Sequence, residues 1–200
     1  HWADPAGAST TDYDLYVLNA TGTAILASST NTQNGTQNPF EYTGASGTYP
    51  AGSRVIIAKK NGEPDRMFWM NWYRGELTHG TAGATKGHSA AANAFSVAAT
   101  PVNAPGPYPG VFSGTDTVET FSSDGPRRIF FDFDGNLLPG APAGNFTSSG
   151  GVERLKPDIT AADGVATSTS GFSPFFGTSA AAPHAAAIAA LLKQAFPAWT

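Results

Sequence analysis

Ser179 stands where a serine could act as a nucleophile, in a Gly-Thr-Ser stretch at the start of an alanine-rich segment. A serine hydroxyl reacts at neutral pH only when a base takes its proton and hydrogen-bond donors stabilise the oxyanion that forms. At the first turn of a helix, the free backbone N–H groups and the positive end of the helix dipole favour such an oxyanion. Gly177 permits a tight turn just before the serine, and Pro183 falls near the first turn, where its missing N–H costs little. The opposite interpretation is that Ser179 or Thr178 only caps the helix, which is the commoner role for these residues.

Four short motifs, in one order along the chain, carry a resemblance to a known family. They are NAFSVAAT at residues 93–100, FSSDGP at 121–126, KPDITAADG at 156–164 and GTSAAAPHAAAIAALL at 177–192. The last three resemble the F-S-x-x-G-P, K-P-D-I-x-A-P-G and G-T-S-x-A-x-P-x-x-A patterns of the subtilisin-like serine peptidases (subtilases), and the first resembles the strand that precedes them. The resemblance covers residues 85–200 and implies the C-terminal part of a subtilase catalytic domain. It also implies that Ser179 is the catalytic nucleophile and that its backbone N–H belongs to the oxyanion hole. Two departures, Ala-Ala-Asp-Gly in place of A-P-G and an alanine-richer helix, are not expected to affect the chemistry.

The residues around Ser179 exclude other catalytic classes. An α/β-hydrolase nucleophile is followed two residues later by glycine, and position 181 is Ala. A Ser-x-x-Lys enzyme needs lysine three residues on, where Ala182 stands. The chain has no cysteine, so a cysteine nucleophile, a thiolate zinc site and disulfides are excluded.

The base that would activate Ser179 is harder to find. The resemblance implies a histidine and an orienting aspartate upstream of the serine, in the chain order Asp, His, Ser. His184 lies five residues after Ser179 and about 140° around the helix axis, so it cannot take the Ser179 proton. His1 and His88 lie in no recognisable motif.

His79 is the remaining candidate, because HGTAGAT resembles the family's catalytic-histidine motif. In that family the histidine opens a buried helix and follows a separate aspartate block, and the sequence around His79 shows neither. We therefore expect a loop or surface role for His79. The Asp, the His and the oxyanion Asn are predicted to lie in an N-terminal segment that precedes His1, which makes this chain an inactive fragment on its own.

The segments expected to position Ser179 predict an α/β layer. Runs led by small apolar residues predict strands at 93–100, 117–123, 127–136 and 156–164, and the segment from Ser179 to Phe196 predicts a long helix. Strands of small residues and a closely packed alanine helix fit the parallel sheet of a subtilisin-like domain. We assign residues 81–200 to this incomplete catalytic domain.

Residues 1–80 have a different pattern and predict an all-β module inserted in that domain. Alternating apolar residues predict a hairpin over 12–29, and further strands are expected at 39–44, 54–60 and 66–77. The expected architecture is an antiparallel, jelly-roll-like β-sandwich, which resembles the pre-peptidase C-terminal domain of secreted peptidases. Its predicted core consists of Leu15, Val17, Tyr42, Val55 and Ile57.

The composition of the chain limits the kinds of partner that it is expected to bind. The net charge is −4 and the 11 Lys and Arg residues are scattered, which argues against nucleic acid or an anionic membrane as a partner. The apolar run 185–192 is far shorter than the roughly 20 residues of a membrane span. No metal or cofactor is expected, although Asp12 and Asp14 leave calcium open beside their commoner role as solvated strand-edge residues. Low charge, many small polar residues and no cysteine suit a secreted bacterial protein.

Three functions are compatible with these observations. The first is a subtilisin-type serine endopeptidase acting on polypeptides, in which this chain works with the remaining N-terminal half of the catalytic domain. The second is a non-enzymatic β-sandwich binding module attached to a pseudo-protease scaffold. The third is a pseudo-protease whose full-length form lacks the Asp or the His. The helix motif favours a peptidase over a pure binding module, which has no need of Gly-Thr-Ser at a helix start.

Overall fold

The computed structural model describes residues 1–44, 48–72, 75–102 and 116–199, and the chain divides into two compact units. The first unit comprises His1–Thr78 with Arg128–Val152, and the second comprises His79–Arg127 with Glu153–Thr200. The first limit lies close to the boundary expected at residue 80. Residues 128–152, however, were expected with the C-terminal region and belong to the first unit.

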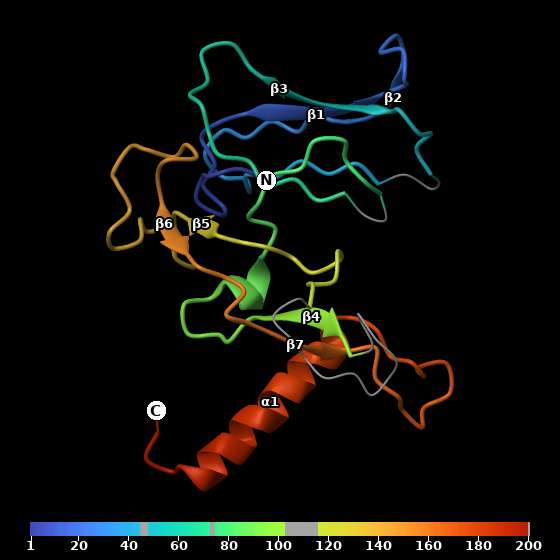
Figure 1. Ribbon diagram of the computed structural model, residues 1–200. Coiled ribbons are helices and arrows are strands. Elements are labelled where there is room, and N and C mark those ends of the chain that lie inside the picture. The colour runs from blue at the N-terminus through green and yellow to red at the C-terminus, as the bar shows by residue number, and fades with distance from the viewer. Residues whose placement is uncertain (45–47, 73–74, 103–115, 200) are drawn as a thin grey trace. The chain divides into compact units, whose positions relative to one another are not determined.

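Short strands and one long helix make up the regular structure of the described residues (Figure 1). The strands are β1 (Tyr13–Leu18), β2 (Ile25–Ser29), β3 (Arg54–Lys59), β4 (Val97–Pro101), β5 (Arg127–Ile129), β6 (Val152–Arg154) and β7 (Ile159–Asp163). A short 3-10 helix spans Gly87–Ala90, and the helix α1 spans Thr178–Ala195. Within the described ranges, no helix has the length and apolar character needed to cross a membrane.

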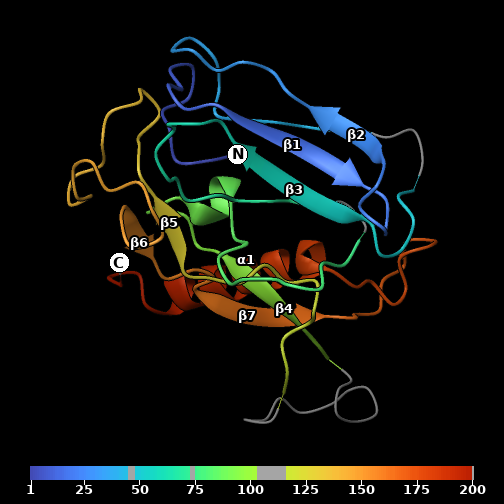
Figure 2. The same ribbon diagram turned by 90° about the horizontal axis from the view of Figure 1, so that it is seen from above.

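The first unit is built on a three-stranded antiparallel sheet in the order β2-β1-β3 (Figure 2). The β1–β2 connection is the expected hairpin, and the side-chain oxygen Oδ1 of Asn19 closes its turn by accepting hydrogen bonds from the backbone N–H groups of Thr23 and Ala24 at 2.9 and 3.2 Å. The predicted strand at 54–60 is confirmed as β3. The strands expected at 39–44 and 66–77 are wrong: the described residues there form loops, apart from an isolated bridge between Phe68 and Trp2.

Loops with aromatic side chains, rather than a second sheet, cover the inner face of this sheet. Tyr13 and Val17 lie on that face and are 2% and 1% exposed. The Tyr13 ring makes edge contacts with the rings of Trp2 and Phe68, with centroids 5.2 and 4.7 Å apart. The expected jelly-roll sandwich is therefore not found among the described residues, because these bulky loop residues already bury the face that a second sheet would cover.

The predicted core of this unit is only partly correct. Val17 is buried and Leu15 and Val55 are half-buried, but Tyr42 is 68% exposed and Ile57 39% exposed. Tyr42 lies in a loop outside the sheet, which explains why strand periodicity misplaced it.

Residues 128–152 join the first unit through aromatic contacts. The rings of Trp69 and Phe130 lie 5.9 Å apart, and the Arg66 guanidinium lies over the Phe146 ring at 4.9 Å from its centroid. The Met67 N–H donates to the Phe146 carbonyl at 2.7 Å. Contacts of this kind link segments far apart in the sequence, so the pattern of either segment alone does not reveal them.

The second unit contains a parallel pair of strands, β4 and β7, against which α1 packs (Figure 2). The buried contact is made of small side chains from all three elements: Ala99, Ala161, Ala181 and Ala185. Such small side chains let the helix backbone approach the strands closely. The expected strands at 93–100 and 156–164 and the helix from about Ser179 are confirmed, whereas 117–123 contains no strand and the strand expected at 127–136 is only the three residues of β5.

Candidate functional site

Ser179 is the second residue of α1 and is exposed. The residue before the helix, Gly177, has φ of +125°, a conformation that L side chains rarely adopt, which explains the glycine at this turn. The Gly177 carbonyl accepts hydrogen bonds from the N–H groups of Ala180 and Ala181 at 2.9 and 3.2 Å. The turn therefore presents the serine at the beginning of the helix, as the motif predicts.

The hydroxyl and the backbone N–H of Ser179 both remain available. Among the described residues, neither group forms a hydrogen bond, and no Thr178 or Ser179 side chain caps the helix. The capping interpretation is thus not supported by the geometry. A free hydroxyl beside a free N–H at the positive end of an 18-residue helix is an arrangement suited to nucleophilic attack with stabilisation of an oxyanion.

The Lys-Pro-Asp segment fixes the start of β7 against β4. The Lys156 ammonium, on a residue only 8% exposed, donates to the Ala94 carbonyl at 2.6 Å and to both carboxylate oxygens of Asp158 at 3.0 and 2.8 Å. Asp158 also accepts the Ser96 N–H at 2.7 Å. The hydrogen bond from Lys156, followed by that from Ser96, lowers the pKa of Asp158 below its ordinary value. This motif therefore sets the register of the two strands that support α1.

The Phe-Ser-Ser-Asp-Gly-Pro segment lies against the same strands. The Ser122 hydroxyl accepts the Ala99 N–H at 2.9 Å. A Cβ added to Gly125 would lie 1.7 Å from the Lys156 carbonyl oxygen, so only glycine fits. All four motifs found in the sequence thus meet in the second unit around β4.

No hydrogen bond joins Ser179 to a described histidine of this unit. The Nδ1 atom of His184 lies 2.7 Å from the Ala180 carbonyl on the same helix, which is the local role expected for it. His79 and His88 are both exposed. His79 lies in a bend with no helix following it directly, and Asp124 holds the loop after it through the N–H groups of Gly83 and Ala84 at 3.0 and 3.1 Å. His1 belongs to the other unit.

Asp163 is a residue whose place at the site the sequence reasoning missed. It is fully buried (0% exposed) at the end of β7, and its carboxylate accepts the Gly177 N–H at 2.7 Å. The Ala-Ala-Asp-Gly departure from the A-P-G pattern was expected not to affect the chemistry, yet its Asp contacts the turn that carries Ser179. The available signal was an acidic residue at the carboxyl end of a predicted parallel strand, where ligand and catalytic groups gather in α/β folds.

The structure gives little support to calcium binding by Asp12 and Asp14. One oxygen of each carboxylate is buried without a partner in the described residues. The Lys60 ammonium already contacts Asp12, and the Tyr16 hydroxyl donates to Asp14 at 3.2 Å. Within the described ranges, no group of three or more His, Cys, Asp or Glu residues is placed to hold a metal ion.

A cavity of about 1,030 Å³ lies in the first unit. Aromatic side chains are prominent in its lining, among them Tyr42, Tyr49, Trp69 and Trp72, and all its lining residues fall within 1–77. It contains none of the four motifs, so the size of this cavity does not identify the catalytic site.

Comparison with known proteins agrees with the motif geometry. The model of the subtilase family (Peptidase_S8), a family of serine peptidases, matches residues 2–200. No curated protein and no solved structure matches the chain significantly. The family match spans nearly the whole chain and includes the Gly-Thr-Ser turn, the Lys-Pro-Asp segment before β7 and the glycine that packs on that segment. The chain therefore belongs to the subtilase family.

Proposed function

We propose that this chain is the nucleophile-bearing part of a secreted serine endopeptidase, with Ser179 as the nucleophile. The observation that carries the proposal is the exposed Ser179 hydroxyl beside its own unbonded N–H at the start of α1. Family membership supports a peptidase that acts on polypeptides. Secretion is proposed on the low charge and the absence of cysteine.

The general base and its orienting aspartate are proposed to lie outside these 200 residues, as is the oxyanion-hole asparagine. In the second unit His184 is held by its own helix, and His79 and His88 make no hydrogen bond to Ser179. The outer side of α1 supports a missing partner segment, because Ile188, Leu191 and Leu192 are 56%, 65% and 45% exposed. A helix that is apolar on several sides is normally buried on them. We assign that covering role to the N-terminal half of the catalytic domain, with residues 1–80 as a β-module inserted between the halves.

The proposed reaction is the acyl transfer of a serine peptidase. Ser179 Oγ attacks the carbonyl carbon of the scissile peptide while the histidine takes its proton. The Ser179 N–H then donates to the oxyanion of the tetrahedral intermediate, aided by the positive end of the helix dipole. Collapse of the intermediate breaks the C–N bond, and the histidine returns the proton to the leaving amine. Water, activated by the same base, hydrolyses the acyl-enzyme and restores the hydroxyl.

The test is the Ser179→Ala substitution in the complete protein. Loss of the nucleophile from such a triad lowers kcat on the order of 10⁶-fold, so casein cleavage should disappear. Folding should be almost unchanged, because alanine is a good helix former and the side chain is exposed. Casein hydrolysis measured alongside circular dichroism checks both expectations.

His79→Ala is the matched control for the choice of base. The exposed His79 lies in a loop, so its loss should leave activity within a few-fold of the wild type. Casein cleavage by Ser179→Ala at a near wild-type rate would disprove the role of Ser179. A large loss with His79→Ala would instead bring the base back inside this chain.

The alternative of a binding module on an inactive scaffold has one observation in its favour, the aromatic cavity of the first unit. Under that alternative the complete protein cleaves no peptide bond and Ser179→Ala changes nothing. The same pair of assays therefore separates the two functions.

A further inference from the structure

The Asp163 carboxylate and the turn before α1 form a contact that the proposed reaction does not yet use. Asp163 ends β7 and is 0% exposed. Its Oδ2 accepts the Gly177 N–H at 2.7 Å, and its Oδ1 has no hydrogen-bond partner among the described residues. A fully buried acidic side chain is rare unless it is paired, so its presence at this point needs a reason.

The contact fixes the backbone that carries the nucleophile. Gly177 has a φ of +125°, which residues with a side chain rarely adopt, and lies two residues before Ser179. A buried acceptor on its N–H holds that peptide in one orientation, and the following peptides start α1 from it. The acidic group also lies beside the positive end of the helix dipole, where negative charge is favoured.

Backbone hydrogen bonds also close the loop between β7 and the turn before α1. The N–H groups of Gly164 and Val165 donate to the Phe175 carbonyl at 2.8 and 3.3 Å, and the Phe175 N–H donates back to Val165 at 2.8 Å. This backbone bridge holds the base of the loop but ends before Gly177. Asp163 is therefore the described side chain that connects β7 directly to the residue preceding the helix.

We propose that Asp163 is a positioning residue of the peptidase, which sets the place of the Ser179 hydroxyl and N–H through the Gly177 turn. This inference rests on the proposed function of Ser179. Placement errors of about 1 Å at such a centre can cost about 10²-fold in rate. Substrate binding depends on other surfaces, so the effect should fall on kcat rather than on KM.

The experiment compares substitutions at Asp163 in the complete protein. Asp163→Ala removes the acceptor, whereas Asp163→Asn keeps a side-chain oxygen that can accept the Gly177 N–H. We expect Asp163→Ala to lower kcat and the rate of Ser179 labelling by a fluorophosphonate about 10²-fold, with KM within about threefold. Asp163→Asn should recover most of the loss, to within about tenfold of the wild type.

Asp124→Ala is the matched control, because Asp124 is also a carboxylate that accepts backbone N–H groups in the same unit. It should lower the unfolding temperature while the folded protein is labelled at the wild-type rate. Wild-type labelling of folded Asp163→Ala would overturn the proposal. If Asp163→Ala does not fold, Asp163→Glu replaces it, since the extra methylene displaces the acceptor. Wild-type labelling of Asp163→Glu, or failure of both variants to fold, would likewise overturn it.

Labelling of the wild-type protein distinguishes the proposed function of Ser179 from the positioning role of Asp163. A wild-type protein whose Ser179 is not labelled refutes the proposed function itself. Normal labelling of the wild type together with normal labelling of Asp163→Ala refutes only the positioning role.

Discussion

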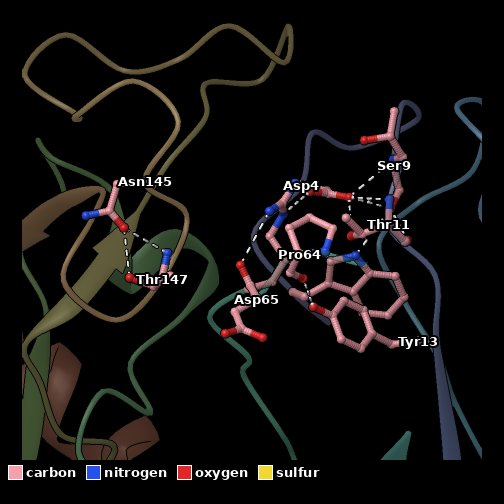
Figure 3. A network of polar contacts seen from close by, with 11 residues as sticks. Asp4, Ser9, Thr11, Tyr13, Pro64, Asp65, Asn145 and Thr147 are labelled. Carbon is pink, nitrogen blue, oxygen red and sulfur yellow. Dashed lines mark hydrogen bonds and ion pairs between the residues drawn. The ribbon is translucent and has the colours of Figure 1, made fainter. Parts of the chain in front are cut away.

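Asp4 is a buried carboxylate of the first unit that gathers several donors around it. Its Oδ2 accepts hydrogen bonds from the Ser9 hydroxyl at 2.9 Å and from the Thr11 hydroxyl at 2.6 Å (Figure 3). Arg66 Nε donates to Oδ1 at 2.6 Å, and the side chains of this ion pair are only 11% and 2% exposed. Burial alone would raise the pKa of Asp4, but the hydrogen bonds from Thr11, Arg66 and Ser9 outweigh it and hold the pKa below its ordinary value.

A pH-dependent contribution to stability follows from that lowered pKa. The carboxylate stabilises the folded state fully above its unfolded pKa of about 3.9, and this contribution is lost as the pH falls through the lower folded pKa. Asp4→Asn removes the charge from a buried pair and should cost about 3 kcal/mol in the free energy of unfolding at pH 7. The difference from wild type should shrink below about pH 4. Urea unfolding at pH 7 and at several pH values below 4 measures it.

Asp65→Asn is the control for Asp4, since Asp65 pairs with Lys59 at 2.6 Å but the two side chains are 80% and 43% exposed. Solvent screens such a pair, so its loss should barely change stability. Equal destabilisation by the two substitutions at pH 7 would contradict the role assigned to burial at Asp4.

Among the elements, the contact between Gly125 and the segment that leads into β7 gives the sharpest prediction. Because a Cβ at Gly125 would lie 1.7 Å from the Lys156 carbonyl, Gly125→Ala must displace backbone that Lys156 itself anchors. We expect a loss of at least about 2 kcal/mol, which lowers the unfolding temperature by about 4–8 °C. Gly80→Ala is the matched control, because nothing lies within 4 Å of its added Cβ. Thermal unfolding at the same temperature for both variants would refute the packing argument.

The elements also show what a sequence can and cannot predict. The hairpin of β1 and β2, the parallel strands β4 and β7, and α1 follow from local alternation, small-residue runs and the Gly-Thr-Ser start. Local patterns fail where aromatic residues pack as loops, as around Phe68, and where a strand as short as β6 exists only through pairing.

The same division holds for the candidate site. Ser179 is evident from its motif because neighbouring residues specify the turn. Asp163 is not, because its role depends on a hydrogen bond to a residue 14 positions away, which no local pattern encodes.

The second unit has exposed features that bear on the proposed function. The second unit exposes Ile159, Ile188, Leu191 and Leu192 around a pair of strands and a helix, and its Ser179 lacks a base among the described residues. Under the proposed function, the N-terminal half of the catalytic domain would cover the exposed apolar surface and would also supply the base for Ser179. When that half folds against the second unit, it would do both at the same time.

The 200-residue chain by itself should therefore neither cleave casein nor react with a fluorophosphonate at Ser179. A serine hydroxyl without a base remains protonated and reacts very slowly, whatever the quality of its oxyanion donors. The complete protein should be labelled on one serine, and its Ser179→Ala variant should not be labelled. Intact-mass measurement after incubation, with circular dichroism to verify that the short chain is folded, gives the comparison. Stoichiometric labelling of Ser179 in the short chain, abolished by His79→Ala, would place the base in the loop at His79 and remove the need for any other segment.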